Sequence, residues 1–340
     1  ALPGISTKAK STINVTGEFA QLIPGSPRGI KIDGDGTSYI DDFENSQTTI
    51  DIRTVTQWQI ASTPQGQTDL WPESALSNDV AYGLNRAKLA WYVVDPLFHR
   101  NNTLTPDHIR NDPDQQSNHF VREVLITELF PAKDIPNGQP TNMAVLNMAF
   151  YPTERGPYNF DVEPTAYSAG LNPDGSLAQP ETRWGGIMRA ITQSNFETAN
   201  VEFIQMWILD PFVYDPTAQG GDLYIHLGNI SEDILRDNRK AFENGLPEGT
   251  TIEEVDSTAW GHVPTNQSIV NAFANDPDAR ARQDIGLDGL NNNLEANWPY
   301  SNVDGAPSYL DLVAAAYGTN SGAYQQALND PANDDYHYYR

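Results

Sequence analysis

The chain contains no cysteine, few basic residues and no long hydrophobic run. Without cysteine it has no thiol nucleophile, zinc–thiolate site or iron–sulfur ligand. Its 20 Lys and Arg residues are outnumbered by 45 Asp and Glu residues, which gives a formal net charge of -25. Since nucleic-acid binding depends on Lys and Arg that displace counterions, this balance argues against nucleic acids and anionic lipid surfaces as partners. Divalent cations and basic protein surfaces are compatible with it.

Familiar catalytic motifs are also missing. The sequence has no G-x-S-x-G elbow, no H-E-x-x-H helix motif and no G-x-x-x-x-G-K-[ST] loop. The six histidines are scattered without the spacing of metal ligands. The longest nearly apolar stretch, residues 201–209, is much shorter than the roughly 20 residues of a membrane-spanning helix. We therefore expect a protein that is not an enzyme.

Seven segments are rich in Val, Ile, Phe, Tyr or Trp and are bounded by Pro, Gly, Asn or Asp, which is typical of β-strands. They comprise residues 48–60, 87–98, 120–130, 143–151, 185–191, 199–209 and 221–227. In residues 221–227 the apolar positions alternate, as in a half-buried strand. Residues 201–209 are apolar on both faces, which predicts a central strand with Trp207 in the core.

These segments predict a mainly β fold of two stacked antiparallel sheets, that is, a β-sandwich with long loops. A parallel α/β sheet is disfavoured because no amphipathic helices alternate with the segments. We expect an irregular lead-in at residues 1–36, the sandwich at residues 37–230, and a partly helical extension packed on it at residues 231–340.

Two segments of this extension resemble helices. Residues 231–242 begin with Ser231 as a suitable N-cap, carry acidic residues in the first turn and basic residues later, and precede Gly245. Residues 308–317 form a second, more apolar candidate.

Residues 33–44 match much of the calcium-binding loop of an EF-hand. Its ligand positions are occupied by Asp33, Asp35, Thr37, Asp41 and Glu44. Because Ca²⁺ takes about six to eight oxygen ligands, this spacing suits the ion. However, Ser38 stands where the EF-hand turn has glycine, and the preceding segment looks extended. An acidic turn that leads into a strand is the alternative.

Residues 284–295 form a second partial match. Asp284, Asp288 and Glu295 occupy the first, fifth and twelfth positions, and Gly289 occupies the sixth. Gly286 stands where a further acidic ligand is usual. A glycine turn capped by aspartates is the alternative here. Ca²⁺ is the only cofactor that the sequence indicates.

Two other functions remain open from the residues alone. Exposed tryptophans on a jelly roll could stack against sugars, and Trp71 and Trp184 are the best candidates. A glycoside hydrolase needs only two carboxylates across a cleft, so 45 acidic residues leave that activity open.

Several short phrases, in order along the chain, resemble the SprA (Sov) family. They lie at residues 39–44, 61–64, 154–159, 171–175, 183–188, 195–203, 207–212, 220–225, 227–235, 242–247, 283–289 and 335–338. Each phrase is short, but their number and order extend the resemblance from about residue 37 to the last residues of the sequence.

The resemblance implies a role in the type IX secretion system and gliding motility of Bacteroidetes. SprA proteins are very large outer-membrane β-barrels that act as protein-conducting translocons. This chain lacks a barrel's series of amphipathic strands, so we expect a soluble, non-catalytic domain of the larger protein, with a galactose-binding type of jelly roll. It would face the cell surface, or else the periplasm, and would cap the pore or dock partners. Those partners would be other outer-membrane secretion proteins and secreted cargo.

Overall fold

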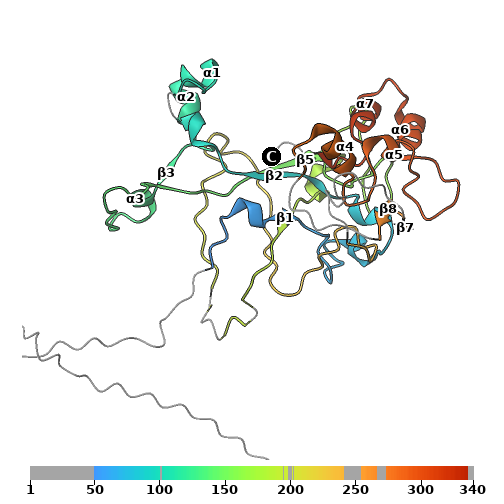
Figure 1. The fold of residues 1–340 in the computed structure, drawn as a ribbon, viewed down its shortest axis with the longest axis horizontal. Coiled ribbons are helices and arrows are strands. Elements are labelled where there is room, and N and C mark those ends of the chain that lie inside the picture. The colour runs from blue at the N-terminus through green and yellow to red at the C-terminus, as the bar shows by residue number, and fades with distance from the viewer. Residues whose placement is uncertain are drawn as a thin grey trace, which may run out of the picture. The chain divides into compact units, whose positions relative to one another are not determined.

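A computed structural model describes residues 50–99, 102–193, 195–197, 201, 203–240, 254–265 and 273–335, without the side chain of Arg282. The chain divides into two units. The larger comprises residues 51–192 and 206–340, and the smaller comprises residues 1–50 and 193–205. Most of the smaller unit lies outside the described residues. The elements below belong to the larger unit, and most of the helices and strands are labelled in Figure 1.

The predicted mainly β sandwich is wrong. Strand makes up 13% and helix 22% of the structure. The described strands form four separate two-stranded antiparallel sheets, not the two large sheets of a sandwich. They pair β1 (Gln59–Ile60) with β6 (Ile187–Met188), β2 (Ala87–Tyr92) with β5 (Asn147–Arg155), β3 (Val124–Leu125) with β4 (Asn142–Met143), and β7 (Val255–Ser257) with β8 (His262–Pro264).

The longest sheet pairs β2 with β5. Leu89 lies opposite Phe150 and Tyr92 opposite Asn147, and the register shifts between Ala87 and Lys88. Aromatic and aliphatic residues favour such cross-strand pairs. β2 lies within a segment whose composition predicted a strand, and β5 overlaps another such segment but ends four residues beyond it.

The described helices are short. The α-helices are α1 (Asp107–Arg110), α2 (Pro113–Gln116), α3 (Ile126–Leu129), α4 (Pro277–Gln283), α5 (Asn292–Glu295), α6 (Tyr309–Tyr317) and α7 (Gly322–Asn329). The 3₁₀ helices are η1 (Val55–Gln57), η2 (Pro72–Ala75), η3 (Val80–Gly83), η4 (Pro96–His99) and η5 (Pro180–Thr182). None of the helices in the described ranges is long and apolar enough to cross a membrane.

Helix α6 confirms the predicted helix at residues 308–317. Ser308 caps it, and the side chain of Asp311 accepts a hydrogen bond from the backbone of Ser308, which completes a capping box. The helix buries Tyr309 and Val313 and packs against α7 (Figure 1).

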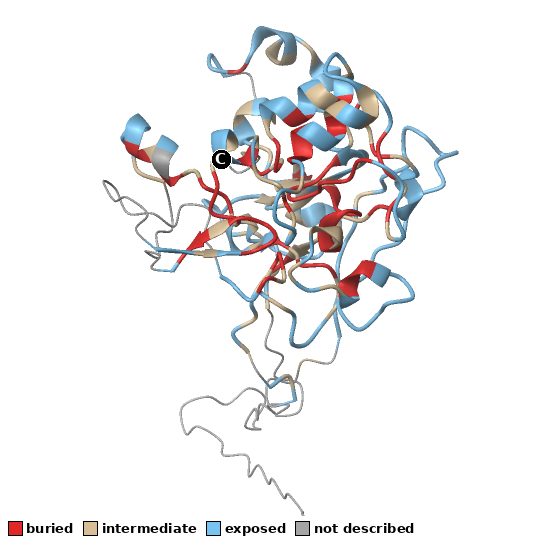
Figure 2. Ribbon diagram, turned by 90° about the vertical axis from the view of Figure 1, so that its right-hand side faces the viewer, coloured by how far each residue is buried: buried red, intermediate tan, exposed pale blue. Residues whose placement is uncertain are grey.

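An aromatic core connects segments that are distant in sequence. The ring of Phe160 stacks on Tyr300 with centroids 3.7 Å apart, and it contacts Tyr309 edge-on at 5.3 Å. The ring of Trp260 is tilted against that of Phe160, with their centroids 6.0 Å apart. Figure 2 shows how buried residues gather between the C-terminal helices and the loops beneath them. The core includes residues from both sides of the boundary predicted at residue 230.

Polar side chains support the loops around this core. Arg183 forms a fully buried ion pair with Asp161 at 2.8 Å, and it also donates to the carbonyl oxygen of Gly170. Asn159 donates to the carbonyl oxygens of Leu84 and Arg86. Irregular backbone has no ladder partners of its own, so buried carbonyl groups need such donors.

Several expected elements are wrong within the described residues. The described residues of segments 201–209 and 221–227 form no strand, and residues 231–240 form no helix. In the segment at residues 120–130, the expected strand is reduced to β3, and α3 follows it. Trp207, expected in the core, is 63% exposed. In the expected helix, Arg236 and Asn238 instead adopt left-handed backbone conformations, with φ of 53° and 62°. This turn buries Ile234 and Leu235 in the core, so tertiary packing overrides the helical pattern.

Glu73 leads to a prediction about pH. Its side chain is buried in η2, where Oε1 accepts a hydrogen bond from the indole of Trp184 at 3.3 Å and Oε2 has no described partner. Burial raises the pKa of Glu73 above its usual value. The folded state therefore binds a proton at Glu73 more tightly than the unfolded state does. The stability that this protonation contributes is lost as pH rises from about 4.3, the unfolded value, through the folded pKa.

We expect Glu73→Gln to raise the melting temperature at pH 7 and to lose this advantage near pH 4. Thermal unfolding of both proteins across that range measures the difference. An advantage that is equal at both pH values would contradict the assignment of a raised pKa.

Candidate functional site

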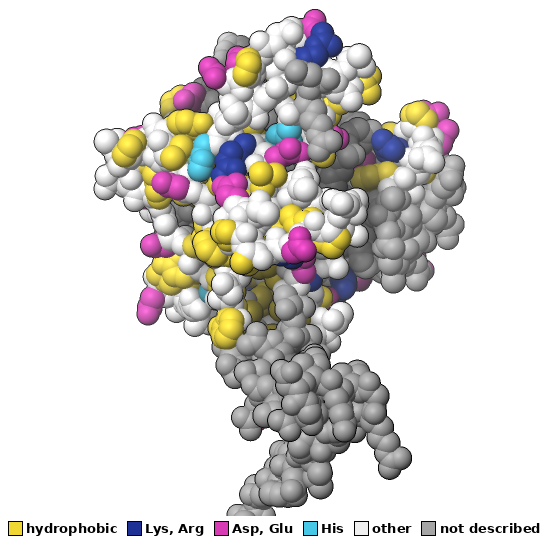
Figure 3. Space-filling model, turned by 90° about the vertical axis from the view of Figure 1, so that its left-hand side faces the viewer, with side chains coloured by type: hydrophobic (Ala, Val, Ile, Leu, Met, Phe, Trp, Pro, Cys, Tyr) yellow, Lys and Arg dark blue, Asp and Glu magenta, His cyan; other side chains and the backbone are white. Residues whose placement is uncertain are grey.

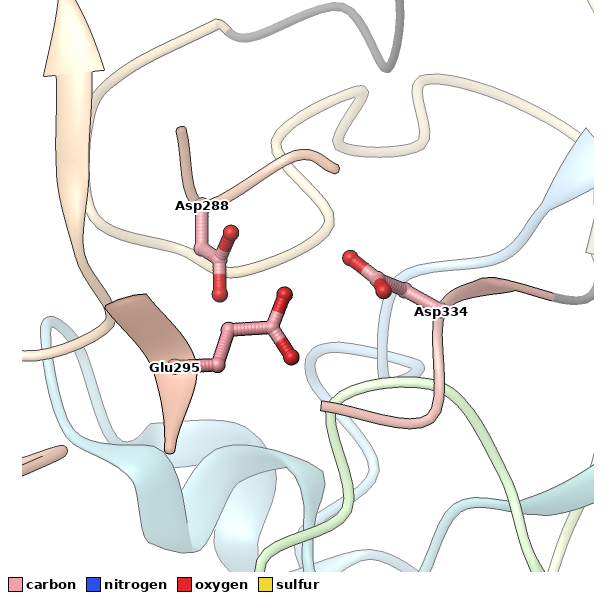
Figure 4. A group of neighbouring side chains, drawn as sticks. All are labelled: Asp288, Glu295 and Asp334. Atoms are coloured by element: carbon pink, nitrogen blue, oxygen red, sulfur yellow. The ribbon is translucent and has the colours of Figure 1, made fainter. Parts of the chain in front are cut away.

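Three buried carboxylates meet beside the aromatic core. They belong to Asp288, Glu295 and Asp334, and one oxygen from each lies within 4.8 Å of the others. Figure 4 shows the carboxylate of Glu295 between those of the two aspartates. The three residues are 0%, 1% and 7% exposed, respectively. Three acidic groups without water around them are costly unless protons or a cation neutralise them.

The turn between α4 and α5 positions Asp288. Two glycines in this turn adopt left-handed conformations, Gly286 with φ of 58° and Gly289 with φ of 78°. A Cβ atom on Gly289 would lie 1.9 Å from the carbonyl oxygen of His262, so this position requires glycine. The turned backbone lets the amide of Leu290 donate to Oδ1 of Asp288 at 3.0 Å.

The next two carboxylates come from α5 and from the C-terminal segment. Asn291 caps α5, which ends at Glu295. The amide of Ala332 donates to Oε2 of Glu295 at 3.0 Å, and this bond fixes the segment that carries Asp334. The hydroxyl of Tyr158 donates to Oδ2 of Asp334 at 3.0 Å. Asp334 also fits closely against Gly286, where a Cβ would meet its carboxylate.

Burial and mutual repulsion disfavour the charged forms of these groups. Burial, and then the charge of Asp288, raises the pKa of Glu295 to about 10. Burial also raises the pKa of Asp288 and of Asp334 well above the usual range, and repulsion from Glu295 adds to the effect on Asp334. Without a cation, the cluster therefore retains protons at neutral pH, which a bound ion would displace.

One oxygen of the cluster has no hydrogen-bond partner. Oε1 of Glu295 is buried and accepts no hydrogen bond from the described residues. The bonds that do reach the cluster come from backbone amides and tyrosine hydroxyls, including Tyr300, whose hydroxyl is 3.5 Å from Oδ2 of Asp288. Among the described residues, no lysine or arginine forms an ion pair with any of the three carboxylates.

The predicted metal-binding residues have different outcomes. Asp33, Asp35, Thr37, Asp41 and Glu44 lie outside the described residues. The structure brings Asp288 and Glu295 together, but the group does not include Asp284. Asp284 is half-buried, and burial followed by repulsion from Asp335 and Asp330 raises its pKa to about 6.

Sequence analysis missed Asp334. The acidic segment at residues 330–335 was a possible sign of further ligands. However, the ligand spacing within the loop at residues 284–295 does not indicate a residue about forty positions later in the sequence. Tertiary packing brings the two segments together, through the bond between Ala332 and Glu295.

The tryptophans proposed for sugar stacking are not open platforms. Trp71 is 7% exposed, and its ring meets the rings of Tyr224 and His226 at 5.3 Å and 5.6 Å. The indole of Trp184 donates to Glu73, and the guanidinium of Arg86 lies 5.4 Å from its ring centre.

A scan of this sequence against models of known protein families finds no match. A search of curated proteins likewise finds no protein that matches the chain.

Proposed function

We propose that this chain is a non-catalytic part of an outer-membrane protein-conducting channel of the SprA type. In this role it would offer an extended apolar segment to a neighbouring protein of the secretion machinery. The observation that carries this proposal is the exposure of residues 206–230, which we call the apolar segment. Figure 3 shows one face of the molecule, where hydrophobic and acidic side chains are common and basic ones are few.

The apolar segment exposes many large hydrophobic side chains. They are Met206, Trp207, Ile208, Phe212, Val213, Tyr214, Leu223, Tyr224, Ile225, Leu227 and Ile230. Single exposed hydrophobic residues are normal on a protein surface, but so many large ones within one short segment favour an interaction site. Removing such a run from water stabilises a complex by about 25 cal/mol for each Å² of apolar surface.

The backbone of the apolar segment also favours a protein partner. None of its residues belongs to a helix or a strand. Unpaired amide and carbonyl groups between apolar side chains form a template for an added strand. The four described sheets have only two strands each, and isolated two-stranded sheets are only marginally stable. Additional strands from a neighbouring protein would pair such edges.

Contacts near Tyr214 and near Tyr224 attach the apolar segment to the rest of its unit. The hydroxyl of Tyr214 accepts from the backbone amide of His119 at 2.9 Å, and its ring meets Phe120 edge-on. Further along, Tyr224 and His226 contact Trp71. These anchors restrict the segment before binding, which lowers the entropy lost when a partner orders it.

The acidic cluster does not favour the glycoside hydrolase alternative. Glycoside hydrolysis places its two carboxyl groups on opposite sides of a bond in an open cleft. Asp288, Glu295 and Asp334 are instead buried, and a polysaccharide could not reach them without rearrangement.

Fractionation of native cells tests the proposal. An antibody against this 37.6 kDa chain should detect a band of several-fold greater mass in the outer-membrane fraction. A soluble band near 37.6 kDa would contradict the proposal.

A site-specific photocrosslinker at Trp207 then tests the role of the apolar segment. We expect adducts with peptides of an outer-membrane secretion protein, or of a remote part of the same polypeptide. Leu104 provides a matched control because it is 78% exposed and lies outside the segment. Equal adducts from both positions, or adducts with lipid alone, would refute a protein partner at the apolar segment.

A further inference from the structure

We propose that Asp288, Glu295 and Asp334 bind one Ca²⁺ ion, and that this ion joins the C-terminal segment to the turn between α4 and α5. This donor set differs from the EF-hand pattern of the sequence, because Asp334 replaces Asp284. The site is separate from the apolar segment, and its existence does not depend on the partner proposed for that segment.

The separation of the three oxygens suits a common ion. Ca²⁺ binds oxygen ligands at about 2.3–2.6 Å, so two oxygens on the same ion lie no more than about 5 Å apart. One oxygen from each of the three residues satisfies this limit, since all lie within 4.8 Å of one another. Figure 4 shows the three side chains converging from three separate segments of the chain.

The unpartnered oxygen of Glu295 points to a missing ligand. Buried carboxylate oxygens normally accept hydrogen bonds, and leaving one without a partner costs free energy. Oε2 of Glu295 accepts a hydrogen bond from the amide of Ala332, whereas Oε1 has no partner among the described residues. Figure 4 shows the carboxylate of Glu295 between those of the two aspartates. A cation bound within this cluster would supply the partner that Oε1 lacks.

The ligand atoms indicate which kind of ion the site would bind. The site has only oxygen atoms, so it suits hard cations and not zinc or copper, which favour nitrogen and sulfur. Mg²⁺ needs a near-ideal octahedron and retains several waters, whereas Ca²⁺ tolerates irregular carboxylate sites. Three buried carboxylates close to one another therefore favour Ca²⁺.

Calorimetry of the whole chain, treated with EDTA and then dialysed, tests the site. We expect Ca²⁺ to bind with a submillimolar Kd and more tightly than Mg²⁺ by about tenfold or more. Asp334→Asn should weaken binding of Ca²⁺ by about tenfold or more, because it removes one of the three charged donors. Asp304→Asn is the matched control, since Asp304 is exposed and the charge change is the same.

Thermal unfolding adds a readout that distinguishes ligation from a purely structural role. In EDTA, Asp334→Asn should melt at or above the temperature of the wild type, because it leaves fewer acidic groups buried together without a cation. In millimolar Ca²⁺ the order should reverse, since the wild type gains more from the ion.

Three outcomes would overturn the proposal. One is an absence of Ca²⁺ binding by the wild type at millimolar concentration. Another is an equal response to Ca²⁺ in the wild type and Asp334→Asn. The third is loss of binding in a double Asp33→Asn, Asp35→Asn variant with full binding in Asp334→Asn, which would move the ion to the other predicted loop. If Asp334→Asn does not fold, Glu295→Gln provides the same comparison.

Discussion

Arg183→Met should lower the free energy of unfolding by about 3–5 kcal/mol, which is the cost of removing one partner of a buried ion pair. Arg183 and Asp161 have fully buried side chains, so the remaining carboxylate would lose its counter-charge in a dry environment. The guanidinium also donates to the carbonyl oxygens of Leu84, Ala178 and Gly170, which would be left without these donors. Urea denaturation with a constant m value measures the change.

An exposed ion pair provides the control. Arg53 and Asp51 form a pair whose side chains are 44% and 50% exposed, so Arg53→Met should cost about 1 kcal/mol or less. The double variant Arg183→Met, Asp161→Asn should lose less stability than the sum of the single variants, because neither charge then remains alone. Similar losses for Arg183→Met and Arg53→Met would contradict the structural role of the buried pair.

Trp260→Ala should also cost about 3–5 kcal/mol, as expected for a large aromatic side chain removed from a core. Trp260 is fully buried beside Phe160, so its removal would leave a cavity in the core. Its indole nitrogen has no hydrogen-bond partner among the described residues. Trp260→Phe should therefore lose less stability, because it retains an aromatic ring and removes an unsatisfied buried donor. Chemical denaturation measures both variants.

Trp207 provides the control for Trp260, because it is a tryptophan that lies outside the core. Because it is 63% exposed, Trp207→Ala should change the stability of the isolated chain by about 0.5 kcal/mol or less. A loss of several kcal/mol at Trp207, with little loss at Trp260, would contradict the arrangement of the core.

The sequence predicts individual elements better than their assembly. Residues 87–92 form a strand where aromatic and aliphatic composition indicates one, and Ser308 caps a helix where its position indicates one. These features depend on local chemistry. The predicted sandwich depends on long-range packing of whole sheets, and the short two-stranded sheets do not form one.

The apolar segment illustrates why such predictions fail. Alternating or continuous apolar residues show that a segment avoids water, but they do not identify what covers it. Trp207 was expected in the core of this chain, yet the structure leaves it exposed. Under the proposed function, a neighbouring protein covers the segment, and its sequence pattern reflects that protein.

The candidate metal site was predictable in part. Asp288 and Glu295 lie within one short loop and helix, so their spacing indicated a shared role. Asp334 lies near them only because tertiary packing brings the segment around Ala332 next to Glu295. Spacing within a short stretch of sequence does not predict such a contact. Asp284 has the expected spacing, but it is not in the group of three.

Hydrogen bonds between residues that are distant in sequence have a consequence for the order of folding. Tyr158 binds Asp334 across 176 positions of sequence, Asn302 binds Asn78 across 224, and Ser62 binds Ser231 across 169. Contacts this distant raise the contact order, and chains of high contact order fold slowly because they close large loops before they gain stabilisation. Residues near position 62 therefore cannot reach their final packing until residue 231 has been synthesised, and Tyr158 cannot do so until Asp334 has been synthesised. Until then the loops between these partners stay open.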